Sequence, residues 1–279
     1  MASTTVVQSY DVPTTLNYYS PIGEEPPFQY RVIIHDVRGR ESDYNLDKNG
    51  FQFVKSQSEM KEFDNEDVIE KMYYREVEDL LKKEVGASRV FVFDHTLRRQ
   101  QNVESQVTPE QRVDLVCSCR SKSQPKPTYQ SPVERVHIDQ TFEASIGRVH
   151  RHLGAEAPDL LKGRVRIINV WRPIGHTVAH KPLAVSDWRY LDAENDLIPV
   201  RFIYPDREGG TFNVRYNPNH KWHYLSNQTP DEVTFIKCFD SKVDRARLCP
   251  HSAFLDESSP KDAPRRESIE VRALVFSDD

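Results

Sequence analysis

Alternating apolar and polar residues recur in short stretches along the chain and predict a protein built mainly of β-strands. Successive side chains of a strand point to opposite faces, so alternation marks an element with one buried face. After residue 130 such stretches follow one another with few helices between them, which favours a barrel or jelly roll. The predicted strands cover residues 29–37, 88–93, 164–171, 199–204, 212–216, 221–225, 233–239 and 268–276.

Two other stretches have apolar residues at the spacing of a helix. One runs from Asn65, a residue suited to cap a helix, to about Lys83, and the other runs from Thr141 to Leu153. We expect the first helix to cover the back of a sheet. The apolar positions of the two helices are Val68, Ile69, Met72, Tyr73, Val77, Leu80 and Leu81, and then Phe142, Ile146, Val149 and Leu153.

The chain is expected to consist of a short arm and one large domain. Residues 1–27 are rich in Pro, Ser, Thr and Tyr and predict an extended arm, whereas residues 28–279 suit a single mainly-β domain with flanking helices. The polar residues 99–130 predict a long loop. This loop is either a surface excursion or a flap that closes over a site, and the sequence leaves both readings open.

Composition narrows the class of protein. The net charge is −5 without a run of like charge, which argues against nucleic acid or an anionic membrane as the partner. The sequence shows neither an apolar run of transmembrane length nor a signal-peptide pattern, so we expect a cytoplasmic protein. It also lacks a Gly-rich phosphate loop, which argues against nucleotide-dependent chemistry. The cysteines expected to be free thiols are Cys117, Cys119, Cys238 and Cys249.

His137 and Asp139 lie in the alternating stretch 133–141 and would share one face of a strand. An imidazole and a carboxylate are two of the three ligands of a 2-His-1-carboxylate triad. Such a triad binds ferrous iron and leaves positions open for a co-substrate and oxygen. The same two residues would also suit a hydrogen-bonded surface pair, so the interpretation depends on a second histidine.

His251 is the favoured second histidine because an Arg-x-Ser pair lies downstream of it in the chain. Arg266 and Ser268 share one face of the last predicted strand, and a guanidinium fork with a hydroxyl suits a carboxylate. Arg272 lies on the same face and is the alternative carboxylate anchor. The remaining candidate histidines are His150, His152, His176, His180, His220 and His223.

Five segments resemble the fungal asaB hydroxylase/desaturase family, which is related to a bacterial cephem methoxylase component. The resemblance extends over roughly residues 28–278. His176 and His180 depart from it, because they stand in a loop where such sequences often carry small or acidic residues. The segments are IINVWRPI (167–174), KPLAVSDW (181–188), QTPDEVTFIKCFDS (228–241), CPHSAF (249–254) and RESIEVRALVF (266–276).

The resemblance implies a double-stranded β-helix, cupin-like core and chemistry that depends on Fe(II), 2-oxoglutarate and O2. By position, His137, Asp139 and His251 would bind iron, and Arg266 and Ser268 would hold the distal carboxylate of 2-oxoglutarate. The expected reaction is hydroxylation, desaturation or oxidative cyclisation of a small metabolite derived from an amino acid, peptide or polyketide. The alternatives are a non-redox metal-binding cupin-like protein and a methyltransferase.

Four residues are predicted to contact the substrate. Arg172 would pair with a substrate carboxylate, unless it forms a structural salt bridge, for instance with Asp187. Asn169, Tyr204 and Trp188 would line the pocket, although core packing is an alternative for each. A homodimer is the expected assembly if the protein is oligomeric.

Overall fold

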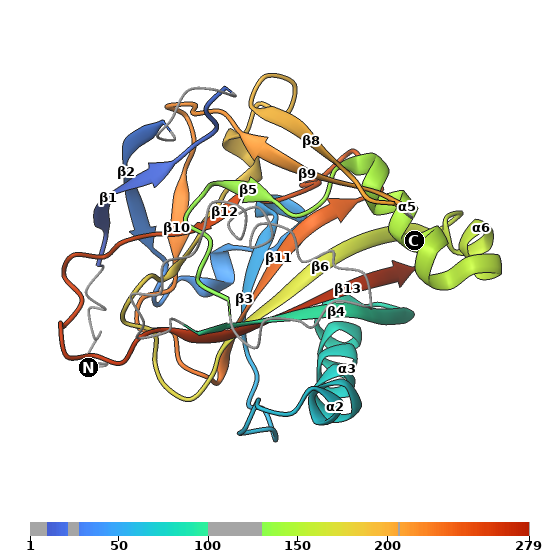
Figure 1. Ribbon diagram of the computed structural model, residues 1–279, viewed down its shortest axis with the longest axis horizontal. Coiled ribbons are helices and arrows are strands. Elements are labelled where there is room, and N and C mark those ends of the chain that lie inside the picture. Colours follow the sequence, from blue (N-terminus) through green and yellow to red (C-terminus); the bar gives the residue numbers. More distant parts are fainter. Residues whose placement is uncertain (1–9, 22–27, 100–129, 206, 279) are drawn as a thin grey trace, which may run out of the picture.

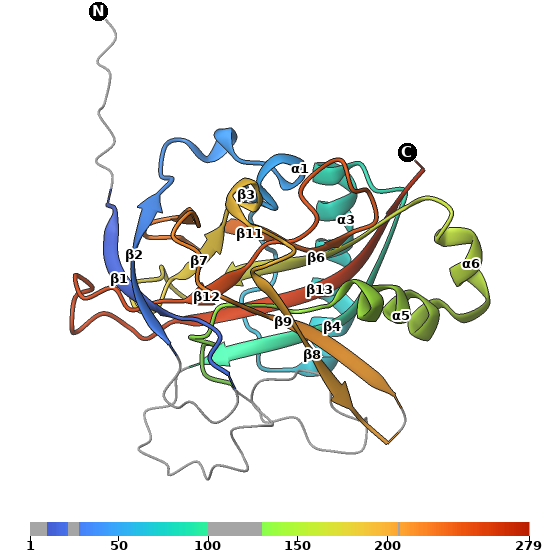
Figure 2. The same ribbon diagram turned by 90° about the horizontal axis from the view of Figure 1, so that it is seen from above.

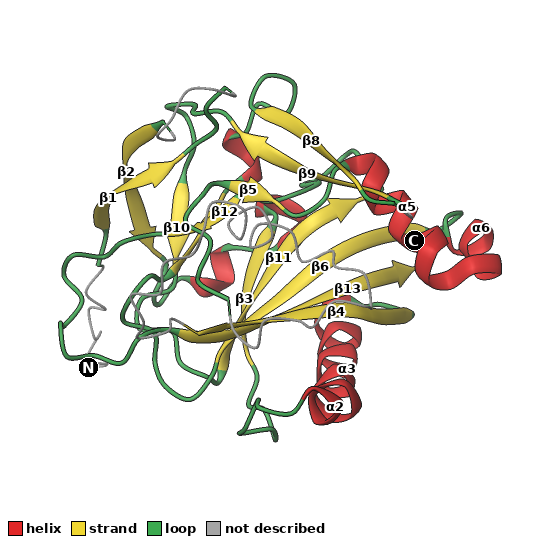
Figure 3. Ribbon diagram, viewed as in Figure 1, coloured by secondary structure: helices red, strands yellow, loops and turns green. Residues whose placement is uncertain are grey.

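The computed structural model describes residues 10–21, 28–99, 130–205 and 207–278. Two sheets form the body of the molecule, and the longer helices lie at its margins (Figures 1 and 3). The predicted loop at 99–130 lies, except for its two end residues, outside the described residues, as do Cys117 and Cys119. Cys238 and Cys249 are buried free thiols, as predicted for these two.

The larger sheet has eight strands in the order β1-β2-β10-β7-β12-β5-β9-β8, and it curls around the smaller one (Figure 2). Most of its neighbouring strands are antiparallel, but β10 pairs with β2 in parallel. The bounds are β1 (Val12–Asn17), β2 (Gln29–Asp36), β10 (Trp222–Tyr224), β7 (Leu183–Ser186), β12 (His251–Ala253), β5 (His137–Ile138), β9 (Glu208–Val214) and β8 (Leu197–Ile203).

The smaller sheet has five antiparallel strands in the order β3-β11-β6-β13-β4. Apolar side chains of both sheets, such as Trp171 and Val185, pack together between them. This double-stranded β-helix, or jelly roll, is the predicted fold class. The bounds are β3 (Phe51–Lys55), β11 (Glu232–Asp240), β6 (Arg164–Pro173), β13 (Glu267–Ser277) and β4 (Arg89–Arg99).

The helix predicted from Asn65 covers the outer face of the five-stranded sheet (Figure 1). Asn65 accepts a hydrogen bond from the amide of Val68 and begins α2 (Glu66–Val68), which continues through the π-helical segment η2 (Ile69–Tyr73) into α3 (Tyr74–Val85). Its buried side chains join Val170 and Val271 of the sheet in one apolar cluster. Burial of each large apolar side chain contributes about 1.5–3 kcal/mol.

The second predicted helix is also present, as α5 (Phe142–Leu153), with the Thr141 hydroxyl as its N-cap and Gly154 after its last residue. The remaining helical segments are short. They are η1 (Glu41–Asp43), α1 (Leu46–Asn49), η3 (Gly154–Glu156), α6 (Ala157–Leu160) and η4 (Trp188–Tyr190).

Several strands differ from their predicted bounds for tertiary reasons. β4 continues to Arg99, six residues beyond the predicted end, because its polar side chains lie beside β13 on the inner face of the sheet. β3, β7 and β12 were not predicted as strands; each has five residues or fewer, too short for a clear alternating pattern. Within the predicted arm, β1 pairs with β2 and is the edge strand of the larger sheet.

Candidate metal centre

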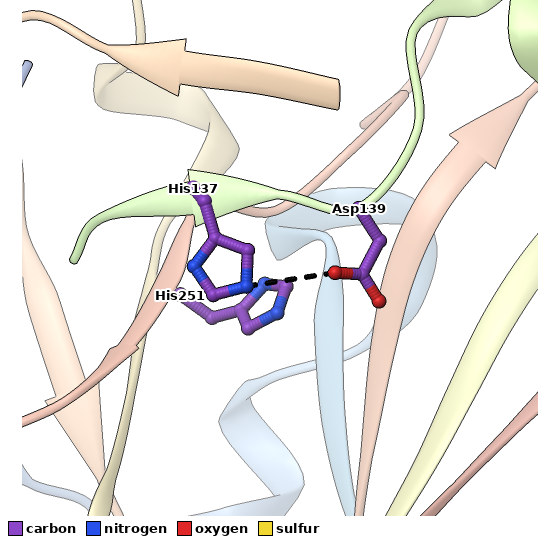
Figure 4. A group of neighbouring side chains, drawn as sticks. All are labelled: His137, Asp139 and His251. Atoms are coloured by element: carbon purple, nitrogen blue, oxygen red, sulfur yellow. Dashed lines mark ion pairs between the residues drawn. The ribbon is translucent and has the colours of Figure 1, made fainter. Parts of the chain in front are cut away.

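His137 and His251 face each other across two neighbouring strands. They are directly paired in the register of β5 and β12, and their ring centroids are 4.4 Å apart. Asp139 follows β5, and its Oδ1 lies 3.5 Å from His137 Nε2 (Figure 4). One ligand atom from each of the three residues lies within 4.8 Å of the others. The structure thus brings together the three residues predicted to bind iron.

Both histidines direct a nitrogen lone pair toward this centre. His137 Nδ1 is 2.7 Å from the carbonyl oxygen of Arg135, and His251 Nδ1 is 3.1 Å from that of Cys249. A carbonyl oxygen only accepts, so each Nδ1 carries the proton and each Nε2 is left with its lone pair. A backbone carbonyl on the second ring nitrogen is a usual way to orient a metal-binding imidazole.

The Asp139 carboxylate is held by one of its two oxygens. Oδ2 accepts hydrogen bonds from Arg272 Nε at 2.9 Å and from Asn169 Nδ2 at 2.7 Å, while Oδ1 faces the histidines. Arg272 also donates to Glu270 at 2.7 Å and to Thr96 at 3.0 Å. Asp139 is therefore arranged to offer a single oxygen to a cation.

The charge state of the centre suits a divalent metal. Burial acts to raise the pKa of Asp139, but Arg272 and the two histidines outweigh it and hold that pKa well below its usual range. Burial and the neighbouring His137 lower the pKa of His251, against the effect of Asp139. At neutral pH the centre thus combines an ionised carboxylate with a neutral His251, the state in which each can coordinate.

A small cavity connects this centre to two arginines. Its lining includes His137, His251, Glu270, Arg266 and Arg98. Arg266 is 3% exposed; its Nη1 donates to the carbonyl oxygen of Lys181 at 2.6 Å, and its guanidinium lies 5.5 Å from the ring centre of Trp171. Burial and the like charge of Arg98 lower the pKa of Arg266 to about 9.

Two buried donors near the cavity have no hydrogen-bond partner among the described residues. They are Arg266 Nε and the hydroxyl of Ser268. Buried polar groups are usually paired, and one left unpaired costs about 1–3 kcal/mol. These two unpaired donors therefore suit the carboxylate of a bound ligand, the role that the sequence predicted for Arg266 and Ser268.

Comparison with known proteins agrees with this geometry. A family model described as an oxidoreductase/YMDC permease-like domain matches residues 13–276. The chain is 38% identical to the hydroxylase/desaturase efuI of Hormonema carpetanum, over 99% of this chain and 98% of that protein. It is 34% identical to the Fe(II)/2-oxoglutarate-dependent dioxygenase nvfI of Aspergillus novofumigatus, over 88% of this chain and 83% of that protein. The chain belongs to this family of oxygenases.

A solved structure supports the same assignment. The iron and alpha-ketoglutarate-dependent endoperoxidase NvfI matches the oxygenase with a TM-score of 0.76 and 29% identity, over 98% of each chain. The predicted family, fold, enzyme class and cofactors, Fe(II) and 2-oxoglutarate, are confirmed, and a small-molecule substrate follows from the class. The described part of the chain contains no helix with the length and apolar character needed to cross a bilayer.

Arg172 does not enter the cavity of the oxygenase, contrary to prediction. It lies on β6 three residues from Asn169, on the opposite face of the sheet. Its Nε donates to the Tyr73 hydroxyl at 2.8 Å, and its Nη1 donates to the carbonyl oxygens of Ser56 and Pro230, each at 2.6 Å. The proposed salt bridge with Asp187 is also absent, because Asp187 pairs with Arg189.

The other three predicted substrate residues do not line the described cavity either. Asn169 is buried and holds Asp139. Tyr204 lies at the end of the β8–β9 hairpin, where the Arg207 guanidinium is 4.2 Å from its ring centre. Trp188 packs against the apolar cluster that contains Phe212. Asn169 thus positions the carboxylate of Asp139, and the side chains of Tyr204 and Trp188 pack against their neighbours.

Sequence reasoning missed the partners of the triad. The sequence offered Arg272 as an alternative anchor for 2-oxoglutarate. In the structure the Arg272 guanidinium forms ion pairs with Asp139 and Glu270. Arg98 was not considered, because the strand that carries it was predicted to end at Phe93. The alternation of Asp94, Thr96 and Arg98 was the available signal.

Proposed function

We propose that His137, Asp139 and His251 hold Fe(II), and that Arg266 and Ser268 bind the distal carboxylate of 2-oxoglutarate. The observation that carries the metal site is the protonation pattern of the two histidines. Their Nδ1 protons are committed to backbone carbonyls, so each Nε2 keeps a lone pair, and one ligand atom from each of the three residues lies within 4.8 Å of the others. Three ligands on one side of an ion leave the opposite positions for a co-substrate and oxygen.

The distribution of charge supports both halves of this assignment. Three carboxylates, Asp94, Asp139 and Glu270, surround the single guanidinium of Arg272 at the end of the site nearest the triad. Arg98 and Arg266 line the cavity at the other end. The carboxylates around the triad suit a metal cation, and the two arginines of the cavity lining suit the carboxylate of a co-substrate.

When bound together, iron and 2-oxoglutarate use O2 to oxidise a C–H bond and release succinate. The residues of the chain orient the participants. Arg272 and Asn169 keep the carboxylate of Asp139 in one position, and the backbone carbonyls keep each imidazole in one tautomer. Trp171 and Leu183 supply apolar wall to the cavity, which limits the entry of water.

We propose hydroxylation, desaturation or oxidative cyclisation of an amino-acid-, peptide- or polyketide-derived metabolite in fungal secondary metabolism. The names of the relatives, which include hydroxylase/desaturase and endoperoxidase, support oxidation of a small metabolite. The cytoplasmic location and the homodimer remain predictions. Cell fractionation and the native mass in solution test these two.

Anaerobic titration tests the proposed site. Fe(II) followed by 2-oxoglutarate should produce a visible charge-transfer absorption in the wild-type protein and none in His251→Ala. His220→Ala is the matched control, because His220 is an equally buried histidine whose two nitrogens contact Tyr18 and Asp196. Absorption that persists in His251→Ala, or succinate that never forms from 2-oxoglutarate with wild type, would reject the assignment.

A further inference from the structure

Arg98 is a buried cation that forms no ion pair with a carboxylate among the described residues, although the charges of Glu270 and Asp139 act on it at longer range. It is 9% exposed on β4, and its Nη1 donates to the carbonyl oxygen of Ser131 at 2.9 Å. It takes part in no ion pair within the described part of the chain. A buried charge without a counterion is costly, and proteins usually pair it or neutralise it. Arg98 therefore requires an explanation that the fold alone does not provide.

Arg98 and Arg266 line the same cavity, and neither forms an ion pair among the described residues. Glu270 is the one carboxylate in the described lining of the cavity, and its charge acts on both guanidiniums. Its Oε1 already accepts hydrogen bonds from Arg272 at 2.7 Å and from Asn169 at 3.3 Å. The cavity thus presents two guanidiniums that share one carboxylate already bound to a third.

The strand register places Arg98 beside the unpaired hydroxyl of Ser268. The two residues are directly opposite each other in the antiparallel pairing of β4 with β13. Directly opposed side chains share a face, and their Cβ atoms are about 4.5–5.5 Å apart. Arg266 lies two residues before Ser268 on the same face. Donors from two strands therefore converge on one part of the cavity.

We propose that Arg98 is a second cationic ligand of the distal carboxylate of 2-oxoglutarate, acting with Arg266 and Ser268; this inference rests on the proposed function. A carboxylate has about four lone-pair sites, more than a hydroxyl and one guanidinium nitrogen satisfy. A second guanidinium would complete the set and neutralise the local charge. It would also make the site selective for 2-oxo acids with a distal carboxylate, because other 2-oxo acids would leave both cations unpaired.

Binding of two 2-oxo acids to the anaerobic Fe(II)-loaded protein tests this role by calorimetry. One is 2-oxoglutarate, and the other is 2-oxopentanoate, which has the same carbon chain without the distal carboxylate. Arg98→Gln should weaken 2-oxoglutarate binding about tenfold to hundredfold, the effect of losing a charged hydrogen bond. Binding of 2-oxopentanoate should remain as in wild type. Arg89→Gln is the matched control, because Arg89 lies on the same strand and pairs with Glu156 at the surface.

Each other outcome has a definite meaning. Unchanged 2-oxoglutarate binding in Arg98→Gln overturns the proposal. An increase only in the Michaelis constant of the oxidised substrate also overturns it, because Arg98 would then bind that substrate. Equal weakening for both 2-oxo acids also overturns it, since the effect would not arise at the distal carboxylate. If wild type itself fails to bind 2-oxoglutarate, the proposed function fails rather than the role of Arg98.

The melting temperature supplies an independent readout. Arg98→Met should not lower the melting temperature of the ligand-free protein, because it removes an unpaired buried charge. The same variant should lose most of the stabilisation that 2-oxoglutarate confers on the metal-loaded wild type. A lower melting temperature with full stabilisation by 2-oxoglutarate would identify Arg98 as a structural residue and overturn the proposal.

Discussion

Among the described residues, histidine and aspartate come together in the triad of His137, Asp139 and His251 and in a second cluster of His220, Asp196 and Tyr18. In the second cluster, Trp222 donates its indole N–H to the Tyr18 hydroxyl, which lies 3.2 Å from His220 Nδ1. His220 Nε2 is 2.9 Å from Asp196 Oδ2. A carboxylate only accepts, so His220 carries its proton on Nε2 and donates it to Asp196, and its Nδ1 accepts the hydrogen bond of the Tyr18 hydroxyl.

The two clusters hold opposite tautomers, and this difference separates the proposed metal site from a structural hydrogen-bond network. The triad histidines use Nδ1 for backbone carbonyls and keep Nε2 for a ligand. His220 has both nitrogens occupied and no lone pair to offer. Proximity of a histidine to an aspartate therefore does not identify a metal site; the partner of the second nitrogen does.

Removing the aspartate from each cluster gives the largest expected contrast. Asp139→Ala should reduce iron affinity by more than the roughly 100-fold that accompanies loss of an outer-sphere partner, and it should abolish turnover. Asp196→Ala should leave iron affinity unchanged and reduce stability by about 1–3 kcal/mol, because His220 loses its acceptor. Metal titration and urea denaturation of both variants measure these effects. Equal iron affinity in Asp139→Ala and Asp196→Ala would contradict the proposed difference between the two clusters in metal binding.

Arg272→Met should be the most destabilising change around the triad. It leaves Asp139 and Glu270 buried without their guanidinium, which costs about 3–5 kcal/mol. Urea denaturation of the metal-free protein measures the loss. Arg201→Met is a suitable control, because its ion pair with Glu208 is exposed and should contribute about 0–1 kcal/mol. Similar losses in the two variants would show that Arg272 is not the counterion of the triad.

The side-chain amides that donate to Asp139 and Asp196 allow a finer test of which groups influence iron binding. Asn169 donates to Asp139, and Asn217 donates to Asp196 at 3.1 Å. Asn169→Ala should weaken iron binding about tenfold, because Asp139 loses one of the two groups that orient it. Asn217→Ala should have no effect on iron binding. Competition with a chelator measures both affinities, and an unchanged value in Asn169→Ala would remove its positioning role.

The smallest expected effect is the pH dependence that His220 contributes to stability. Burial lowers the pKa of His220, and Asp196 offsets this only in part. As the pH falls below the ordinary histidine value of about 6.5, the unfolded chain binds a proton before the folded protein does. The free energy of unfolding should therefore fall with pH in this window and fall less steeply in His220→Gln. Identical slopes in urea denaturation would refute this contribution.

The sequence alone determined the class of the protein and the residues of the triad. Alternation predicted most strands, helical spacing predicted α3 and α5, and the patterns around His137, His251 and Arg266 indicated the iron chemistry. These signals are local, because residue type and spacing along one strand or helix decide them. The Arg-x-Ser pair downstream favoured His251 over the other histidines, and the resemblance to the hydroxylase/desaturase family implied the same residue.

Only the tertiary structure decided how each site residue is used. Arg172 and Asn169 stand on the same strand, yet the packing of η2 on one face and of Asp139 on the other gives them unrelated roles. The pairing of Arg272 with Asp139 joins residues from separate strands, and so does the position of Arg98 opposite Ser268. Register, burial and the second partner of each imidazole arise from contacts between distant segments, which no local pattern contains.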